Sequence, residues 1–165
     1  MGEEKQTTYG FWQWGEMLRE VEEFSWLAWQ KASDKGYPKM MDRARYFVLT
    51  DDSRHNHLIG YTTSTEIEDC VFLVGNTYVE RGYTGKGYHE KLLRWRNDYL
   101  KKYGGHVIYT LLNPQGNTSI EQLRHVVGKL GYEKAKVKDM RNDGVRWTQI
   151  LALKLSRLEI WRKLL

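Results

Sequence analysis

The stretch from Thr77 to Leu93, TYVERGYTGKGYHEKLL, constrains the fold more than any other part of this 165-residue chain. It begins as an apolar, β-branched strand, breaks into a turn with three glycines, and restarts as an amphipathic helix. Glycine allows positive φ angles and a close approach of the backbone to a ligand. The helix that follows directs its unpaired N–H groups and the positive end of its dipole toward the turn. The sequence therefore predicts a seat for a phosphate or diphosphate.

The residues of this turn distinguish between several kinds of phosphate site. A glycine-rich connection between a strand and a helix can also serve packing alone, and that alternative stays open. A dinucleotide site is disfavoured because the motif begins near the middle of the chain, not in a first βαβ unit. A nucleoside-triphosphate loop is excluded because Lys86 stands between two glycines and no Gly-Lys-Ser/Thr sequence follows. A short nest of amides for a diphosphate that needs no Mg²⁺ fits best.

Two motifs, in this order, resemble those of the GNAT superfamily of N-acetyltransferases. Residues Arg81–Gly87, RGYTGKG, and the helical segment Tyr88–Leu93 look like the coenzyme A loop of that family and the helix after it. Downstream, Asn117–Ser119, a predicted helix and then Lys129–Tyr132 are similar to the family's Asn-x-x-Ser/Ala helix that ends in Leu-Gly-Phe/Tyr. The resemblance covers Tyr46–Leu155, and the first 40 residues show nothing familiar.

This resemblance implies an α/β fold (α+β mixed) with a central mixed, mostly antiparallel sheet flanked by helices. It also implies an acyltransferase that moves an acetyl group from acetyl-CoA to an amine acceptor, by direct attack on the thioester and without a metal. The strand before the loop, the loop itself and the next strand end are expected to contact the acyl donor. The expected cofactor-binding residues are Tyr78, Val79, Arg81, Gly82, Thr84, Gly85, Lys86, Gly87, Tyr88, Asn113 and Asn117.

The chain departs from the family pattern in two places. The loop is one residue longer, so Arg81 stands four positions before Gly85, and Gly82 occupies the usual Gln/Arg position. The family often has a tyrosine four residues before the glycine of Leu-Gly-Phe, where it can act as general acid toward the departing thiolate. Val127 occupies that position here. The cofactor site is therefore better supported by the sequence than the catalytic acid.

The catalytic residues are predicted from what the reaction needs, which is a base for the amine and a proton for the thiolate. Glu80 is the preferred base, ahead of Glu66 and Glu68, because it stands where the strand meets the cofactor loop. An ordinary solvated glutamate at a strand end explains Glu80 equally well. Tyr109 is preferred to Tyr132 as the acid. Catalysis by positioning alone also remains open.

Length and composition predict a single domain over residues 1–165, because a chain of this size can bury about 70% of its unfolded surface in one core. No run of 18 apolar residues and no charged-then-apolar leader occurs, so neither a membrane span nor a secretory signal is expected. Cys70 is the single cysteine, which excludes an internal disulfide and favours a reducing, cytoplasmic setting. The five histidines show no zinc spacing, so no metal site is expected.

Charge divides unevenly along the chain. Residues 1–80 carry 8 Lys/Arg and 14 Asp/Glu, whereas residues 81–165 carry 18 and 7. A basic C-terminal half suits polyanionic coenzyme A and an acidic N-terminal half suits a cationic amine, although two differently charged solvated surfaces explain the pattern equally well. Four of the seven tryptophans lie within 18 residues: Trp12, Trp14, Trp26 and Trp29. They either fill the core or line an acceptor pocket, which the N-terminal helices shape in GNAT proteins.

Periodicity and turn residues predict the order of elements. Residues 11–33 are expected to form one helix or two within a helical, acceptor-side segment 1–40, ahead of a core at 46–155. The expected strands are Tyr46–Thr50, His57–Glu68, Val71–Val79, His106–Asn113 and Arg146–Leu155. The expected helices are 86–103, 118–130 with a capping box at Thr118 or Ser119, and a short one at Ser156–Leu165.

Two alternatives to an active N-acetyltransferase stay open. A nucleic-acid-directed protein on the same fold could bind DNA or RNA through the basic C-terminal half, or modify a base. An inactive GNAT-like module could keep the cofactor site, which Val127 makes plausible. The expected partners are acetyl-CoA and an amine acceptor, with nucleic acid as the runner-up and no membrane. The chain is expected to be a monomer or homodimer.

Overall fold

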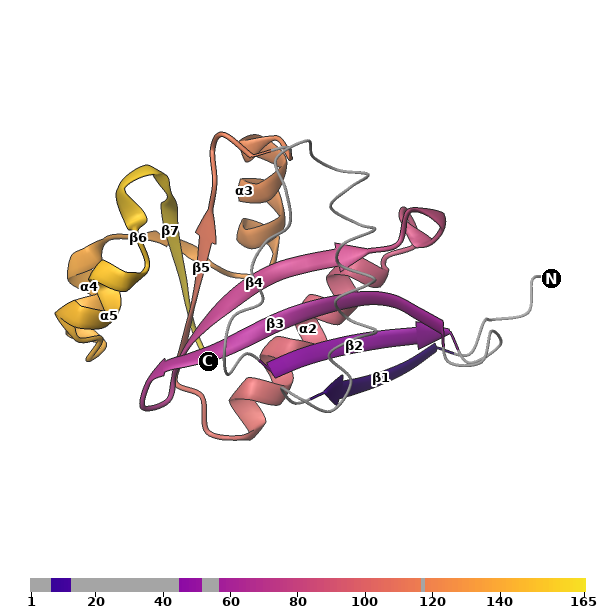
Figure 1. The fold of residues 1–165 in the computed structure, drawn as a ribbon, viewed down its shortest axis with the longest axis horizontal. Coiled ribbons are helices and arrows are strands. Elements are labelled where there is room, and N and C mark those ends of the chain that lie inside the picture. The colour runs from indigo at the N-terminus through magenta and orange to yellow at the C-terminus, as the bar shows by residue number, and fades with distance from the viewer. Residues whose placement is uncertain (1–6, 13–44, 52–56, 117) are drawn as a thin grey trace. The chain divides into compact units, whose positions relative to one another are not determined.

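The computed structural model of the protein describes residues 7–12, 45–51, 57–116 and 118–165. Its strands form a seven-stranded, mostly antiparallel sheet in the order β1-β2-β3-β4-β5-β7-β6, with β4 and β5 parallel (Figure 1). This is the predicted mixed α/β class. In chain order the elements are β1 (Thr7–Trp12), β2 (Arg45–Asp51), β3 (His57–Glu68), β4 (Val71–Val79), the 3₁₀ turn η2 (Arg81–Tyr83), α2 (Tyr88–Lys102), β5 (Val107–Leu112), α3 (Ile120–Lys129), β6 (Glu133–Ala135), α4 (Val137–Asn142), α5 (Trp147–Ala152), η3 (Leu155–Arg157) and β7 (Glu159–Leu164).

The chain divides into two compact units. The first consists of Met1–Ser64 and Asn76–Arg96, and the second of Thr65–Gly75 and Asn97–Leu165. The prediction of a single domain is not tested by this division and stays a prediction. No helix in the described part of the chain combines the length and apolar character needed to cross a bilayer.

In the first unit, β2 is buried on both faces because its side chains alternate between two apolar layers. Phe47 is fully buried and meets the ring of Trp95 on α2 edge to face, with 5.3 Å between ring centroids. On the opposite face Tyr46 and Val48 pack with Leu58 and Tyr61. Each fully buried side chain of this size stabilises the fold by about 1.5–3 kcal/mol. The helix that carries the candidate site is thereby fixed to its sheet.

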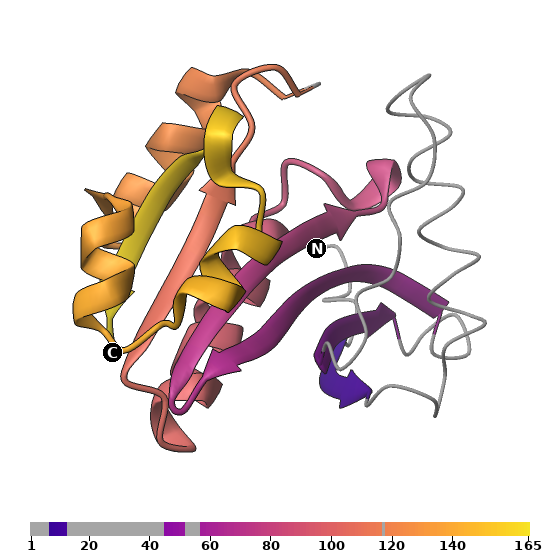
Figure 2. The same cartoon turned by 60° about the vertical axis from the view of Figure 1, so that its left-hand side comes forward.

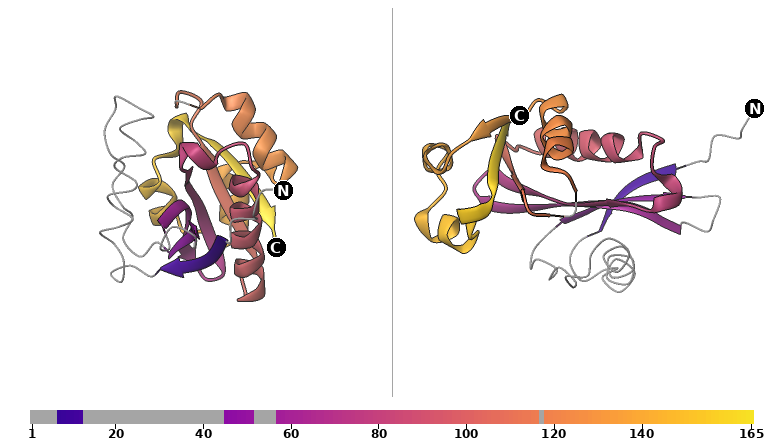
Figure 3. Two further views of the ribbon diagram at one scale, coloured as in Figure 1. Left: turned by 90° about the vertical axis from the view of Figure 1, so that its right-hand side faces the viewer. Right: turned by 90° about the horizontal axis from the view of Figure 1, so that it is seen from above.

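The second unit has a separate core built on one face of β5. Because strand residues alternate, Val107 and Tyr109 point to this face and Ile108 to the other, and all three are buried. Figure 3 shows α3 and the pair α4–α5 on opposite sides of β5 and β7. The core beneath α4 and α5 consists of Ile67, Val71, Val107, Tyr109, Met140, Val145, Ile150 and Ile160.

Several predicted elements are confirmed and others are wrong. The strands His57–Glu68 and Val71–Val79 have the predicted bounds, and the helix expected at 86–103 spans Tyr88–Lys102. Residues Arg146–Leu155 contain helix α5 in place of the predicted strand, and Ser156–Leu165 contains strand β7 in place of the predicted helix. The capping box is also wrong, because Ser119 precedes α3 without a side-chain capping bond.

The alternation over Arg146–Leu155 suggested a strand, but Ile150 is the buried residue of α5 and anchors it as a helix. β7 forms because it pairs with β5 and with β6, and this pairing overrides local propensity. Of the helix expected at 11–33, residues 11 and 12 belong to β1 and the rest lies outside the described residues. Of the clustered tryptophans, Trp12 ends β1. The other three lie outside the described residues, so the acceptor-side role of the cluster stays a prediction.

Candidate active site

The candidate site begins where β4 ends, in the first unit. The Glu80 amide donates to the Ile59 carbonyl at 2.7 Å, which ties the strand end to β3. Gly60 permits this approach, since a Cβ there would stand 3.1 Å from the Tyr78 carbonyl oxygen. Figures 1 and 2 show the chain turning at η2 beyond the end of β4 and returning into α2. The predicted strand, turn and helix are therefore all present.

The turn leaves a run of backbone donors without acceptors. Among the described residues, none accepts a hydrogen bond from the amides of Gly85, Lys86 or Gly87. Gly85 and Gly87 have φ angles of 74° and 80°, and a Cβ built on either would meet nothing within 4 Å. Intrahelical bonding starts with the Lys91 amide, which donates to the Gly87 carbonyl at 3.1 Å. Successive free amides at the start of a 15-residue helix form an anion-binding nest.

A buried hydrogen bond between Tyr83 and Asp51 holds the turn to the end of β2. Tyr83 is 4% exposed, and its hydroxyl donates to Oδ2 of Asp51 at 2.7 Å. Asp51 is the last residue of β2 and is fully buried. The Thr84 hydroxyl donates to the Arg81 carbonyl at 2.8 Å and closes the 3₁₀ turn. The loop is thus fixed to the sheet before any ligand binds.

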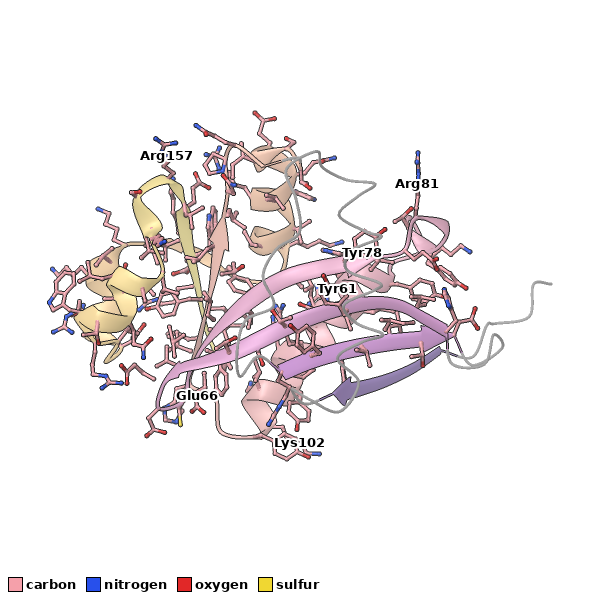
Figure 4. All side chains as sticks on the ribbon, viewed as in Figure 1. Tyr61, Glu66, Tyr78, Arg81, Lys102 and Arg157 are labelled. Carbon is pink, nitrogen blue, oxygen red and sulfur yellow. The ribbon has the colours of Figure 1, made fainter. Side chains whose placement is uncertain are left out.

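Two cationic side chains accompany the nest. Lys86 is exposed, and its Nζ lies 5.8 Å from the ring centroid of Tyr83. Arg81 is also exposed and projects outward from the turn (Figure 4). Tyr88 begins α2, with its ring centroid 6.2 Å from that of Tyr83. Gly82 lies within η2 with open space around its Cα.

Glu80 has a hydrogen-bonding partner on the neighbouring strand. Nε2 of His57, the first residue of β3, lies 3.0 Å from Oε2 of Glu80, and both side chains are about one-third exposed. The other carboxylates that the sequence suggested are engaged elsewhere. Glu66 accepts from the Cys70 amide at 3.1 Å, and Glu68 pairs with Arg146 at 2.6 Å. Glu80 is the one of these three that adjoins the nest.

Tyr78 and Val79 complete the strand that leads to the loop. Val79 is buried, and Tyr78 packs against the cluster that contains Tyr61 (Figure 4). Burial raises the pKa of the Tyr78 hydroxyl, and the nearby Glu80 charge raises it further. The Tyr78 phenol therefore stays protonated at neutral pH.

The remaining predicted residues lie in the second unit. Tyr109 is fully buried, and its hydroxyl donates to Asp143, which Arg162 also contacts at 3.2 Å. Burial and the Asp143 carboxylate raise the pKa of Tyr109 well above its ordinary value. Oδ1 of Asn113 accepts from the Gln115 amide at 3.0 Å and so structures the turn after β5. Asn117 lies outside the described residues.

Tyr132, the alternative acid, and Val127, which stands where the family often has a tyrosine, both have buried side chains. Tyr132 is 5% exposed, and its hydroxyl lies 3.5 Å from Oδ1 of Asn97. Val127 is 7% exposed and is the buried residue of α3. Nothing at position 127 can donate a proton.

Sequence reasoning missed His57, Asp51 and Asp143. Each acts through a residue 23 to 34 positions away, and no spacing rule links such pairs. Tyr83, by contrast, stands inside the loop motif, and a tyrosine among glycines was a signal that this position is buried. Across the described residues no group of three or more His, Cys, Asp or Glu side chains is arranged to hold a metal ion.

No protein-family model matches the sequence, and no curated protein matches it. Solved structures do match. An acetyltransferase of the GNAT family from Staphylococcus aureus is 12% identical, with a TM-score of 0.64 over 95% of this chain and 99% of that chain. The IAA acetyltransferase from Bacillus cereus is 16% identical, with a TM-score of 0.62 over 97% of this chain and all of that chain (100%). The ribosomal-protein-S18-alanine N-acetyltransferase from Escherichia coli is 14% identical, with a TM-score of 0.61 over 79% of this chain and 80% of that chain.

These identities show the fold alone. The chain has the GNAT fold, so the family resemblance predicted from the two sequence motifs is confirmed at the level of fold.

Proposed function

We propose that this protein is an acetyl-CoA-dependent N-acetyltransferase that acts on an amine. The observation that carries the proposal is the run of free amides at Gly85, Lys86 and Gly87, in an open turn at the start of α2. The shared fold supports it, since the matching structures are described as acetyltransferases. Acyl-CoA chemistry needs a diphosphate site without a metal, and this nest offers one.

The loop residues have separable roles in binding the acyl donor. The amides of Gly85 to Gly87 would take the diphosphate oxygens, and the positive end of the α2 dipole would add to their attraction. Lys86 and Arg81 supply positive charge at the rim, suited to the remaining phosphate of coenzyme A. Tyr83 and Asp51 position the loop but do not face the ligand.

The reaction needs a base, an oxyanion donor and an acid. Glu80 is the proposed base that removes a proton from the acceptor amine, directly or through water, and His57 orients its carboxylate. The backbone of Tyr78 and Val79 is the proposed donor to the tetrahedral oxyanion. Tyr109 is the proposed acid for the thiolate. Its raised pKa keeps it protonated, as an acid must be, but its bond to Asp143 opposes transfer of the proton.

The test is calorimetric titration with coenzyme A in the absence of added metal. Gly87→Val should abolish binding, because it both strains a positive φ angle and fills the space above the nest. Gly144→Val is the matched control, because Gly144 has a φ angle of 94° and equally open surroundings but lies after α4. The control should bind like the unmodified protein. No heat of binding for the unmodified protein at millimolar coenzyme A would remove the proposal.

An inactive coenzyme A-binding module is the second candidate. Val127 favours it, because a buried valine replaces the usual proton donor of the fold. Tyr109, the proposed substitute, is already hydrogen bonded to Asp143. Binding of acetyl-CoA without its consumption across a panel of small amines, peptides and oligonucleotides would favour this candidate.

A further inference from the structure

Helix α5 exposes an apolar pair on its surface. Within the described residues four large hydrophobic side chains are mostly exposed, and two of them, Trp147 at 54% and Leu151 at 73%, lie on α5. They are four positions apart and therefore neighbours on one face of the helix. Ile150 is buried in the core and fixes the helix with this pair outward. Adjacent exposed apolar residues mark an interaction site more often than single ones do.

The surroundings of this pair are cationic. The Arg141 guanidinium lies 5.2 Å from the Trp147 ring, and its Nη1 donates to the Val145 carbonyl at 3.0 Å, so it is held in place. Lys138 is exposed one turn earlier on α4. We define the α4–α5 surface as Lys138, Arg141, Trp147 and Leu151.

The acidic residues nearby do not neutralise this surface. Residues 136–157 contain six Lys/Arg and two Asp/Glu. One of the six, Arg146, pairs with Glu68 at 2.6 Å and adds no free positive charge. Asp139 accepts from the Lys136 amide at 2.7 Å, and Asp143 accepts from Tyr109 and Arg162. Both carboxylates therefore serve the protein's own structure. The charge left outward is positive, and its complement is an anion.

We propose that the α4–α5 surface docks an acidic segment of a polypeptide partner that also carries an apolar side chain. Tryptophan and arginine are the residues that most often dominate protein–protein binding energy, and opposite charge speeds encounter. The proposal does not depend on the proposed function, because no residue of this surface belongs to the candidate active site.

Two other anionic partners fit less well. Leu151 is the more exposed of the pair, and an aliphatic side chain gains little from a sugar–phosphate backbone. A membrane would need a wider apolar face than two residues on a six-residue helix, and Met140, Val145 and Ile150 are already used in the core.

The experiment uses the full chain and a fluorescein-labelled peptide of repeated Glu-Glu-Leu, followed by fluorescence anisotropy at low ionic strength. Trp147→Ala, Arg141→Glu and Leu151→Ser should each weaken binding by about tenfold or more. Leu164→Ser is the matched apolar control, because Leu164 is 66% exposed on β7, and Lys101→Glu is the matched charge control on α2. Both should leave binding unchanged. Circular dichroism checks that each variant folds. Leu151→Ser should disturb the fold least, because the side chain of Leu151 is mostly exposed.

Several outcomes overturn the proposal. One is the absence of peptide binding by the unmodified protein. Another is equal binding of polyglutamate without leucine, unaffected by Leu151→Ser, which would reduce the effect to charge. Tighter binding of oligo(dT) or of phosphatidylserine vesicles, lost in Trp147→Ala, would assign the surface to nucleic acid or to a membrane.

Discussion

Glu80 and His57 form the residue pair on which the proposed proton removal depends. Glu80→Gln should lower kcat by about 10²-fold or more, because the amide cannot accept the proton, whereas KM for acetyl-CoA should change little. His57 positions this carboxylate without touching the acyl donor. His57→Ala should therefore lower kcat to a smaller extent, and His57→Gln, which can still donate a hydrogen bond, should restore much of it. Steady-state kinetics that show full activity in Glu80→Gln would exclude Glu80 as the base.

Tyr109 has two possible roles that can be separated, as the acid for the thiolate and as a structural donor to Asp143. If it protonates the departing thiolate, Tyr109→Phe should lower kcat by more than about tenfold, because general acids typically contribute 10²–10⁴-fold. We expect that loss, together with a lower melting temperature, since the partly buried Asp143 carboxylate loses a donor. Asp143→Asn tests the structural part alone. An unchanged kcat in folded Tyr109→Phe would leave protonation to solvent or to Tyr132.

At this scale the sequence predicted residues that stand within a motif and missed those that act across the fold. Gly85 and Gly87 could be predicted because a turn before a helix needs positive φ angles, and both have them. His57 could not be predicted as the partner of Glu80. That pairing exists only because the start of β3 lies beside the end of β4, which is a consequence of sheet register.

Among the elements of the second unit, one carboxylate connects three. Glu159, at the start of β7, accepts hydrogen bonds from Nη2 of Arg124 on α3 at 2.5 Å and from Nε of Arg124 at 3.0 and 3.2 Å. It also lies 3.3 Å from Lys134 on β6. Arg124, with further help from Trp161 and Lys134, lowers the pKa of Glu159 to about 2. A carboxylate with a depressed folded pKa stabilises the fold above its unfolded pKa and loses that effect as the pH falls through the folded value.

Glu159→Gln should therefore lower the melting temperature at pH 7, and the difference should shrink between about pH 4.5 and pH 2. Arg124 is 44% exposed, so solvent screening keeps the effect small. Thermal denaturation at several pH values measures it. Glu133→Gln on β6 is the control, because Glu133 is exposed and the described residues offer it no ion pair. A deficit of Glu159→Gln that stays constant down to pH 2 would contradict the argument.

Elements were predictable from sequence where apolar periodicity was unambiguous. β3 and β4 carry long runs of β-branched and aromatic residues, and their predicted bounds are confirmed. The C-terminal segment was not predictable in this way. Its leucines alternate as in a strand over 151–155, yet α5 is set by Ile150 in the core, and β7 by pairing with β5 and β6. Long-range pairing of this kind leaves no local signal.

At the scale of the whole molecule, the salt dependence of binding can separate the two partner classes that the sequence left open. Residues 81–165 carry a net charge of +11, from 18 Lys/Arg and 7 Asp/Glu, and this half contains the nest and the loop cations. Such a charge attracts both coenzyme A and nucleic acid. The two differ in how many phosphates are contacted. The nest offers amides, which hold a diphosphate through directed hydrogen bonds that salt weakens little.

Coenzyme A affinity should consequently fall by less than about tenfold between 50 and 200 mM salt. Over the same range, the duplex affinity of a protein that contacts 6–10 phosphates falls by about 10³- to 10⁵-fold. Calorimetry with coenzyme A and anisotropy with a labelled DNA duplex, on the same preparation, measure both slopes. Lys86→Ala should reduce the small coenzyme A slope further, because Lys86 is the exposed cation within the loop. A steep slope with duplex, combined with acetyl-CoA consumption that only DNA or RNA stimulates, would replace the amine acceptor by nucleic acid.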